Sequence, residues 1–262
     1  MPKFALITGA SSGIGLALAE ALARRGRNLL LVARQRPALE SIAHELSQRF
    51  AVQTLFRVCD LSQPLQLTGL LHELEQGRLH IDLLINNAAF ASFGPYLEQD
   101  WRQEQALIEV GVLASARLCH SLGQHMQQRG GGQILNVSSL AAFQPGPWMS
   151  NYFASKAYLL HFSEALREEL APHGVRVSVL CPGPTNTGFF RKAGMDVRQM
   201  ADSKFMLSAE AVAQYTLKAL DKNRAIIIPG WRNRLASRLP GFAPRWLTRK
   251  VAARVNRMMA GS

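Results

Sequence analysis

A glycine-rich loop that joins a short apolar run to an amphipathic stretch is the feature that most constrains the fold of this chain. The apolar run is Lys3–Thr8, and Gly9, Gly13 and Gly15 follow it directly. Glycines let a loop backbone approach a phosphate closely, and the first turn of the next helix supplies free amide donors. This order is typical of a strand, loop and helix that bind a dinucleotide pyrophosphate. A turn that only packs the strand against the helix is the alternative.

Short runs rich in leucine and β-branched residues alternate with longer amphipathic stretches along the rest of the chain. The runs are apolar almost throughout, as expected for strands covered on both faces. This alternation predicts an α/β fold, with a single Rossmann-type, doubly wound parallel sheet of about seven strands flanked by helices. The predicted strands are Lys3–Thr8, Asn28–Ala33, Val52–Val58, Ile81–Asn86, Gly132–Ser138, Val175–Cys181 and Ala225–Pro229, and the clearest helical patterns are Ile14–Arg25, Arg36–Arg49 and Tyr152–Ala171.

The positive charge of the chain is concentrated at its C-terminal end. The 262 residues carry a net charge of +12, but residues 231–262 hold eight basic side chains and no acidic one. Residues 1–230 therefore carry a net charge of only +4. A high charge that comes from one tail is poor evidence for nucleic-acid binding, and we expect no nucleic-acid partner.

The cysteines and the N-terminus favour a cytoplasmic location. Cys59, Cys119 and Cys181 are odd in number and scattered, which is typical of buried thiols in a reducing compartment and not of disulfides or a metal site. No apolar run approaches the roughly 20 residues that span a bilayer. Met1 leads almost directly into the first strand, without the pattern of a signal peptide. We therefore expect a cytoplasmic protein without a metal site.

Ser139, Tyr152 and Lys156 have the spacing of a proton-transfer site. Tyr152 and Lys156 are four residues apart on one predicted helix, so they share a face. A nearby ammonium lowers the pKa of a phenol, which would let Tyr152 exchange a proton with a substrate oxygen. Ser139, thirteen residues before the tyrosine, can hydrogen-bond the same oxygen. Because Tyr-x-x-x-Lys also occurs by chance on exposed helices, the interpretation depends on Ser139 and the upstream glycine loop.

Arg34, at the end of the second predicted strand, indicates the kind of nicotinamide cofactor. An acidic residue here would bind the ribose 2′-hydroxyl of NAD. Arg34 after Ala33 instead favours the 2′-phosphate of NADP, because a guanidinium pairs with phosphate through two hydrogen bonds. Ser11 and Arg36 are candidates to assist. A solvated arginine on a loop is the alternative.

Three later loops follow strands at the same predicted edge of the sheet, and they contain Asp60, Asn87 with Ala88, and Thr187. Asp60 is placed to accept a hydrogen bond from an adenine amino group, although an aspartate that only caps a turn fits equally well. Thr187 is placed to reach a nicotinamide carboxamide, and a simple breaker loop is the alternative. The predicted cofactor-binding residues are Gly9, Ser11, Ser12, Gly13, Ile14, Gly15, Arg34, Asp60, Leu61, Asn87, Ala88, Tyr152, Lys156, Pro182, Gly183 and Thr187.

These motifs, in this order, resemble those of the classical short-chain dehydrogenase/reductase family. The resemblance implies an NADP(H)-dependent oxidoreductase that works as a homodimer or homotetramer. It implies a catalytic domain at residues 1–230, with a substrate lid near residues 188–208, and leaves residues 231–262 as a basic tail. The resemblance covers roughly residues 3–230 and rests on Thr8–Gly15, Asp60, Asn86–Ala88, Ser139, Tyr152, Lys156 and Pro182–Thr187.

Two positions depart from the family pattern. Gly111 stands where the family usually has an asparagine that holds a water in a proton relay to the lysine. Ala89 replaces the glycine that usually ends the motif after the fourth strand. The first departure puts the standard relay in doubt, and the second is a small change beside the cofactor.

Apolar side chains around the predicted site suggest a hydrophobic substrate. A lid of this kind favours an apolar carbonyl compound or alcohol, although about half of these side chains can equally be ordinary packing residues. The candidates are Phe90, Phe93, Phe143, Trp148 and Met149 near the edge of the sheet, and Phe189, Phe190, Met195, Met200, Phe205 and Met206 after the Thr187 loop.

The tail from Pro244 onward has the pattern of a basic amphipathic helix. Leu247, Val251, Val255 and Met258 share one side of it, and most of the basic residues lie elsewhere. Such a helix can lie on an anionic membrane, which would place the protein at the inner face of the cell membrane. Docking on the domain or on a second subunit is the alternative.

The primary hypothesis is an NADP(H)-dependent enzyme that reduces a hydrophobic ketone or aldehyde, or oxidises the alcohol. Members with similar motifs act on 3-oxoacyl and steroid substrates. A non-catalytic NADP-binding sensor or membrane-associated scaffold is the rival, motivated by Gly111 and the tail. An isomerase or epimerase that uses nicotinamide transiently is a third possibility.

Overall fold

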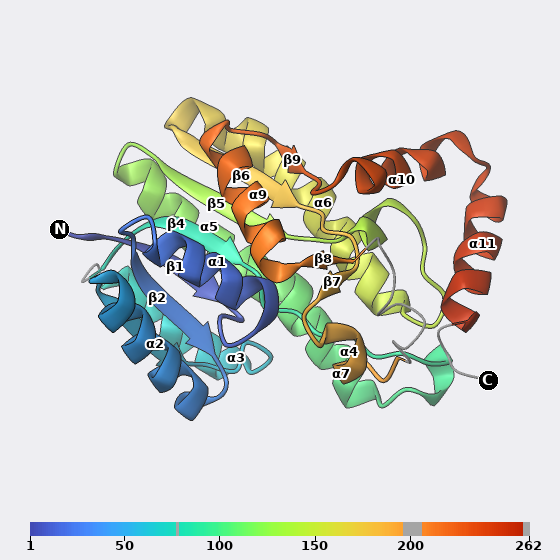
Figure 1. Ribbon diagram of the computed structural model, residues 1–262, viewed down its shortest axis with the longest axis horizontal. Helices are drawn as coiled ribbons and strands as arrows, with labels where there is room; N and C mark the ends of the chain where they lie inside the picture. Colours follow the sequence, from blue (N-terminus) through green and yellow to red (C-terminus); the bar gives the residue numbers. More distant parts are fainter. Residues whose placement is uncertain (77–78, 196–205, 259–262) are drawn as a thin grey trace.

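A parallel sheet forms the centre of the computed structural model, which describes residues 1–76, 79–195 and 206–258 (Figure 1). This confirms the predicted α/β fold, and the strand order reverses between β1 and β4, as in a doubly wound sheet. Within the described residues the sheet has seven strands, in the order β3 (Thr54–Val58), β2 (Asn28–Ala33), β1 (Lys3–Thr8), β4 (His80–Asn86), β5 (Gly132–Val137), β6 (Val175–Leu180) and β9 (Ile226–Ile227).

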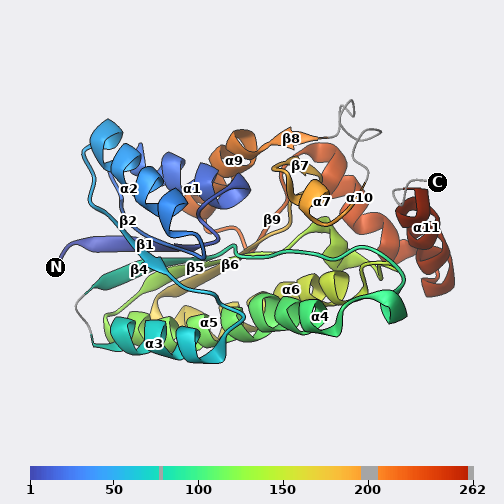
Figure 2. The same cartoon turned by 90° about the horizontal axis from the view of Figure 1, so that it is seen from below.

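Helices cover both faces of the sheet (Figure 2). One face carries α1 (Gly13–Ala23), α2 (Arg36–Phe50) and α9 (Ala209–Asp221). The opposite face carries α3 (Pro64–Glu75), α4 (Trp101–Ile108), α5 (Ser115–Gln128) and α6 (Ser150–Leu170). The layers are therefore those of a three-layer α/β sandwich.

Alternate residues of the central strands belong to the two helical layers. Ala5 and Ile7 pack in the cluster under α1 and α9, whereas Phe4 and Leu6 pack in the cluster with α3 and α5. All four are at most 1% exposed. Because neither face of these strands meets water, both sets must be apolar, which explains the continuous apolar runs of the sequence. Full burial of one large aliphatic side chain contributes about 1.5–3 kcal/mol.

Two predicted strands are shorter than expected by two or more residues. β3 begins at Thr54, not at Val52, and β9 contains only two residues instead of Ala225–Pro229. Pro229 has no amide hydrogen to donate, and Gly230 has a φ of +86°, so the chain leaves the sheet there. β9 pairs only with β6, at the edge of the sheet.

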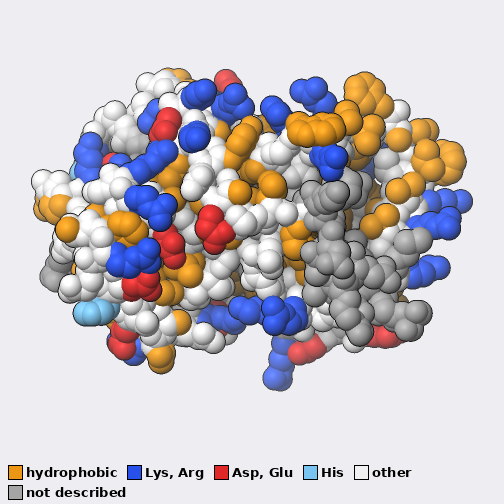
Figure 3. All heavy atoms as spheres, in the orientation of Figure 1, with side chains coloured by type: hydrophobic (Ala, Val, Ile, Leu, Met, Phe, Trp, Pro, Cys, Tyr) orange, Lys and Arg blue, Asp and Glu red, His pale blue; other side chains and the backbone are white. Residues whose placement is uncertain are grey.

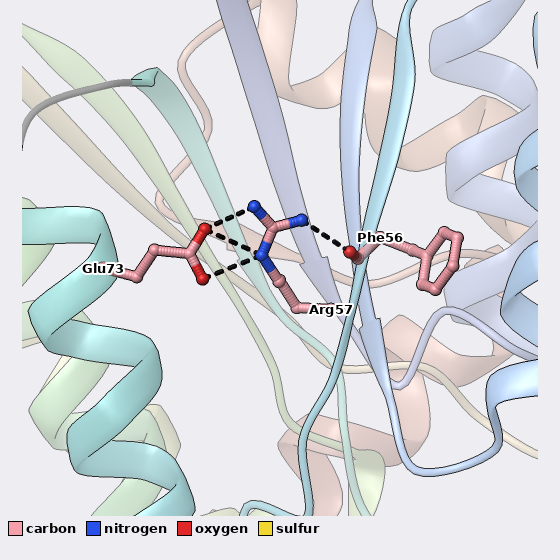
Figure 4. A network of polar contacts seen from close by, with 3 residues as sticks. All are labelled: Phe56, Arg57 and Glu73. Carbon is pink, nitrogen blue, oxygen red and sulfur yellow. Dashed lines mark hydrogen bonds and ion pairs between the residues drawn. The ribbon is translucent and has the colours of Figure 1, made fainter.

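An ion pair holds the other edge strand to a helix (Figure 4). The Arg57 Nε on β3 donates to both carboxylate oxygens of Glu73 on α3, at 2.7 and 2.8 Å, and its Nη1 donates to the Phe56 carbonyl at 2.8 Å. The two side chains are 38% and 40% exposed. Solvent therefore screens the pair, and its contribution to stability is about 1 kcal/mol or less.

Shorter elements lie mainly in the loops that surround the carboxyl edge of the sheet. The predicted lid near residues 188–208 is only partly described, and Met200 and Phe205 lie outside the described residues. The short elements are β7 (Thr185–Asn186), which pairs with β8 (Leu207–Ser208), the helix α7 (Phe189–Lys192), and the 3₁₀ turns η1 (Tyr96–Glu98), η3 (Leu140–Phe143) and η4 (Ala171–His173).

The tail forms two helices where the sequence predicted one. The predicted helix from Pro244 appears as α11 (Arg245–Met258), and α10 (Trp231–Phe242) precedes it. The α10 helix was missed because Pro240 and Gly241 interrupt its pattern near the end. Asn233 of α10 is buried, and its Nδ2 donates to the Pro229 carbonyl at 2.7 Å. The start of the tail is therefore packed against the body.

The stretch from α4 to α5 is one continuous helix with a π-helical turn, η2 (Glu109–Ala114), in its middle. By length and composition, residues 101–128 could cross a membrane, contrary to the expectation from the apolar runs. In the structure 56% of its most apolar window is buried. The stretch is therefore a core helix.

Gly111 lies in the π-helical turn and packs against α6. A Cβ added at this glycine would lie 3.2 Å from the Ser155 Cβ and 3.3 Å from the Ser155 Oγ. Both distances are shorter than ordinary van der Waals contact. The glycine that replaces the family asparagine thus allows a close approach of this turn to the helix that carries Tyr152 and Lys156.

We predict that Gly111→Ala lowers the free energy of unfolding by about 1 kcal/mol. Overpacking a tight contact costs about 1–3 kcal/mol, which outweighs the roughly 0.5–1 kcal/mol that alanine gains over glycine in a helix. The matched control is Gly69→Ala on α3, where an added Cβ meets nothing within 4 Å and should stabilise the protein. Urea unfolding measures both, and equal stabilisation of the two variants would contradict the prediction.

Candidate functional site

A cleft of about 450 Å³ lies at the carboxyl edge of the sheet. Its walls come from the loops that follow the first six strands of the chain, so the parallel sheet gathers residues far apart in the sequence. Of the predicted site residues only Gly15 does not line it. Those that do are Gly9, Ser11, Ser12, Gly13, Ile14, Arg34, Asp60, Leu61, Asn87, Ala88, Ser139, Tyr152, Lys156, Pro182, Gly183 and Thr187.

The glycines of the first loop are required by close backbone packing. Gly9 has a φ of +65°, and a Cβ added there would lie 2.8 Å from the Ala88 Cα. A Cβ on Gly15 would lie 2.4 Å from both the Asn87 Nδ2 and the Gly9 carbonyl oxygen. Gly15 therefore shapes the loop from behind instead of lining the cleft. Close packing therefore accounts for these glycines, and their role in cofactor binding stays a prediction.

Asn87 ties the end of β4 to the glycine loop. Its Nδ2 donates to the Thr8 carbonyl at 2.9 Å and to the Gly9 carbonyl at 3.2 Å. The Thr8 Oγ1 in turn accepts from the backbone N–H groups of Asn87 and Ala88, both at 3.0 Å. The amide of Asn87 is thus occupied by the protein itself, and its backbone and neighbours form the wall of the cleft.

The neighbouring Asn86 points into the interior. Its Nδ2 donates to the Asn136 Oδ1 at 2.9 Å, and the Asn136 Nδ2 donates to the Ser163 Oγ at 2.9 Å. Both asparagines are buried, at 3% and 0% exposure. This network links β4, β5 and α6 beneath the cleft.

The start of α1 is shaped to receive a phosphate. Ser12 is the N-cap residue of this helix, but its side chain makes no capping hydrogen bond. Ser12, Gly13 and Ile14 all line the cleft, so the unpaired amides of the first turn border it. A helix N-terminus of this kind, next to a loop in which side chains would clash, fits the pyrophosphate of a dinucleotide.

The two arginines after β2 differ in their surroundings. Arg34 is exposed, lines the cleft and makes no hydrogen bond or ion pair with the described part of the chain. Arg36 does not line the cleft, and its Nη1 pairs with the Glu40 carboxylate at 3.3 Å. The structure therefore places Arg34, but not Arg36, where a ligand in the cleft can reach it.

Asp60 closes a turn, as the alternative interpretation expected, and its role toward an adenine amino group stays a prediction. Its Oδ1 accepts from the backbone N–H of Ser62 at 3.0 Å and from the Ser62 Oγ at 2.7 Å, which closes a turn. It also lines the cleft beside Leu61. The turn fixes the carboxylate at the end of the cleft that lies near β2 and β3.

Ser139, Tyr152 and Lys156 come together in the middle of the cleft. Ser139 caps the turn η3, where its Oγ accepts from the Ala141 N–H at 3.1 Å. The Lys156 Nζ lies 5.7 Å from the centre of the Tyr152 ring and donates to the Val137 carbonyl at 2.8 Å. Tyr152 also forms a hydrogen bond with Ser139.

Burial shifts the pKa values of Tyr152 and Lys156 so that the neutral form of each is favoured. Burial raises the pKa of Tyr152 to about 12, and the hydrogen bond with Ser139 opposes this only in part. Burial lowers the pKa of Lys156 to about 8, opposed by the charge of Cys181. The expectation of a lowered phenol pKa is therefore wrong for the protein without ligand, because desolvation is the largest influence on the pKa of Tyr152. At neutral pH Tyr152 is a neutral phenol that can donate a proton.

Hydrogen bonds also hold the first turn of α6, on which Tyr152 lies. The Nδ2 of Asn151 donates to the Oε2 of the buried Glu104 at 2.7 Å, and Ser92 donates to the Oε1 of the same carboxylate. The Ser138 Oγ donates to the Lys156 carbonyl at 2.7 Å. These bonds orient the tyrosine and the lysine before any ligand enters.

Apolar side chains surround the other side of Tyr152. Its ring lies 5.3 Å from the Phe189 ring and 6.0 Å from the Phe153 ring, measured between centroids. Of the predicted apolar candidates that the structure describes, Phe93, Phe143, Trp148 and Met206 do not line the cleft. Those that line it are Phe90, Met149, Phe189, Phe190 and Met195.

Several residues that line the cleft escaped the sequence analysis, and Phe153 and Asn256 are two examples. Phe153 was hidden in the helix pattern next to Tyr152. Asn256 comes from α11, more than a hundred positions after the tyrosine, and its Nδ2 donates to the Pro147 carbonyl at 2.8 Å. A polar residue in a basic tail gives no signal of such a position, because the packing of α11 brings it there.

The fold and the cleft define a Rossmann-type protein with its ligand site at the carboxyl edge of the sheet. Residues 3–198 match the family model described as short chain dehydrogenase. The chain therefore belongs to the short-chain dehydrogenase/reductase family, an oxidoreductase family that acts on carbonyl or alcohol substrates with NAD(P)(H).

Three similar proteins illustrate the range of the family. A short-chain dehydrogenase from Sphingobium yanoikuyae in complex with NADPH has a TM-score of 0.83 and 33% identity, with coverage of 92% of this chain and 93% of that one. Hydroxysteroid dehydrogenase-like protein 1 of Gallus gallus is 32% identical over 94% of this chain and 73% of its own length. Inactive hydroxysteroid dehydrogenase-like protein 1 of Rattus norvegicus is 34% identical over 69% of this chain and 55% of its own length.

We predict that the stability of the wild type rises relative to Lys156→Met as the pH rises from about 8 to 10. In the unfolded chain the lysine keeps a pKa of 10.5, so below pH 8 the folded state bears the full cost of burying the ammonium. That cost, on the order of 3 kcal/mol, disappears as Lys156 loses its proton in the folded state. Thermal unfolding of both proteins across this range measures the effect. A constant difference in Tm would contradict the lowered pKa.

Proposed function

We propose that this protein is an NADP(H)-dependent oxidoreductase that reduces a hydrophobic ketone or aldehyde, or oxidises the corresponding alcohol. The observation that carries the proposal is the convergence of Ser139, Tyr152 and Lys156 in a cleft with one glycine-lined end and one apolar end. A neutral phenol, a buried ammonium and an uncapped helix N-terminus around one cleft are not expected from imperfect packing alone.

In this proposal Ser139 and Tyr152 hold the substrate carbonyl oxygen by hydrogen bonds. When bound, NADPH would supply the hydride for the carbonyl carbon. Tyr152 gives its proton to the oxygen, and the alcohol forms. Lys156 stabilises the resulting phenolate, since its ammonium is held beside the ring by the Val137 carbonyl. Oxidation of the alcohol follows the same steps in reverse.

The residues at the glycine-lined end would hold the cofactor. The amides of Ser12, Gly13 and Ile14 would bind the pyrophosphate, and Asp60 would accept from the adenine amino group. Arg34 would pair with the 2′-phosphate, which supports NADP(H) over NAD(H). Thr187, which packs over Gly13, would contact the nicotinamide.

The apolar end supports a bulky hydrophobic substrate such as a 3-oxoacyl or steroid-like compound. Phe153, Phe189, Phe190 and Met195 give this end its apolar lining, and Lys192 of α7 is a cation that also lines the cleft. We also propose a homodimer or homotetramer, a cytoplasmic location and contact of the basic tail with an anionic membrane, on the basis of the family resemblance and the composition of the tail. The division into a catalytic domain, residues 1–230, and a tail stays a prediction.

A non-catalytic NADP-binding protein is the second candidate. A relative named as inactive and the loss of the family asparagine at Gly111 favour it. The presence of all three proposed catalytic residues favours the enzyme. Consumption of NADPH with a panel of ketones of graded chain length and ring size separates the two, and it also tests a third candidate, an isomerase that retains its cofactor.

We predict that Tyr152→Phe lowers kcat for ketone reduction by about 10²–10⁴-fold while NADPH still binds, because the variant keeps the ring and loses only the proton. The matched control is Tyr158→Phe on the same helix, whose exposed ring stacks on Phe162 at 5.4 Å. Steady-state kinetics and fluorescence titration measure turnover and binding. Equal turnover of the two variants would exclude the acid role of Tyr152.

We predict that Arg34→Ala weakens NADPH binding by roughly 10- to 100-fold and leaves NADH binding unchanged. A charged hydrogen bond contributes about 1–3 kcal/mol, and only NADPH carries the additional phosphate. The control is Arg36→Ala, which removes a guanidinium that already pairs with Glu40. Calorimetric titration with both cofactors measures the ratio. A wild type with equal affinity for the two would rule out this role of Arg34.

A further inference from the structure

The outer side of α10 carries an unusually apolar surface for an exposed helix. Trp231, Leu235, Leu239 and Phe242 lie within one face of the helix by their spacing. They are 64%, 56%, 59% and 88% exposed. In the space-filling view, hydrophobic side chains gather over the position of α10 (Figure 3). Large apolar side chains exposed together mark an interaction surface more often than isolated ones do.

The α11 helix also turns apolar side chains outward. Leu247, Val251 and Val255 share one face and are 39%, 53% and 45% exposed. The side that packs on the body lies about a third of a turn around the helix and contains the buried Ala252 and Asn256. The structure therefore does not use the apolar face of α11 to dock on its own domain.

Basic side chains frame this apolar surface. All eight basic residues of the two helices are exposed, and neither helix contains an acidic residue. Two of the cations lie beside exposed indole rings, with Lys250 Nζ 5.6 Å from the Trp246 ring and Arg232 over Trp231. Lysine, arginine and tryptophan around an apolar strip match the charge and layering of an anionic bilayer interface.

The inner side of α11 is connected to the cleft. Asn256 lines the cleft and holds the Pro147 carbonyl. Arg257 lies 4.9 Å over the ring of Trp148, whose φ of +67° is rare for a bulky residue. The next residue, Met149, is buried and lines the cleft. One helix thus borders the cleft on one side and exposes apolar and basic residues on the other.

We propose that α10 and α11 form a docking surface for an anionic lipid bilayer, and that the carbonyl substrate reaches the cleft from that bilayer. The second half of this proposal rests on the proposed function. The substrate class is then an apolar carbonyl compound that partitions into membranes. The surface retains the protein where such a compound is concentrated, and the cleft is bordered by the same helix.

The bilayer fits this surface better than a second copy of the chain does. A self-interface would bring the eight cations of each copy close to those of the other, with no acidic residue on either helix to neutralise them. Anionic headgroups supply that neutralising charge, with about 1 kcal/mol for each basic residue near the surface.

Cosedimentation of the full chain with lipid vesicles tests the docking surface. The vesicles contain phosphatidylcholine alone or phosphatidylcholine with phosphatidylglycerol, at low and high salt. The double variant Leu239→Gln with Phe242→Gln (the apolar pair) removes apolar contacts. Its control is Leu65→Gln, since Leu65 is 87% exposed on α3. Arg245→Gln with Arg249→Gln removes charge, and Arg129→Gln with Lys222→Gln is the matched control away from the tail.

We expect the wild type to bind the anionic vesicles and to lose that binding at high salt. Each basic residue near the surface contributes about 1 kcal/mol, and 1.4 kcal/mol corresponds to a factor of ten. Loss of two cations should therefore weaken partitioning by roughly 30-fold. The apolar pair should weaken it about tenfold or more, and the controls should bind like the wild type. Absence of wild-type binding to anionic vesicles overturns the proposal. So does a dimer in gel filtration that the apolar pair dissociates while vesicle binding is unchanged, because the surface would then join two subunits.

Turnover measurements separate this proposal from the proposed function. A long-chain 2-alkanone is supplied in anionic vesicles, and a short water-soluble ketone is supplied in buffer. The apolar pair should reduce turnover of the vesicle-bound ketone about tenfold and leave turnover of the soluble ketone unchanged. Equal turnover of the vesicle-bound ketone by the pair and the wild type overturns delivery from the bilayer. If the wild type reduces neither ketone, the proposed function fails, and vesicle binding still decides whether the docking surface exists.

Discussion

The junction between β1 and β4 is the constraint on which the site depends. The strand order reverses there, and the Thr8 hydroxyl and the Asn87 amide join the two strand ends by four hydrogen bonds. This junction holds the glycine loop against Ala88 so closely that no Cβ fits on Gly9. Because the loop cannot collapse into the crevice between the diverging strands, a cleft remains at the carboxyl edge.

Burial keeps the proton donor of the site neutral and makes the neighbouring cation costly to hold. The same desolvation raises the pKa of Tyr152 and lowers the pKa of Lys156, because burial disfavours the charged form of each group. The ammonium is kept in place by the Val137 carbonyl and by the packing of α6 against the turn that contains Gly111. The folded state thus bears an electrostatic cost at neutral pH, a pattern typical of functional sites.

The C-terminal helices contribute to the cleft although the family model does not cover them. The family model ends at residue 198, so α10 and α11 lie beyond the matched region. They nevertheless contribute Asn256 to the cleft and contact the loop that contains Trp148. A segment outside the part matched by the family model therefore contributes to the wall of the cleft.

The sequence by itself determined the parallel sheet and most of the residues around the cleft. This was possible because Gly9, Arg34 and Ser139 each follow a strand, and parallel strands end at one edge. Only the tertiary structure decided that Asn86 points inward, that Arg36 pairs with Glu40, and that desolvation raises the pKa of Tyr152. It also decided that Asn256 reaches the cleft. Spacing along a chain reports neighbours within one helix or strand, whereas burial and long-range contacts depend on how separate elements pack.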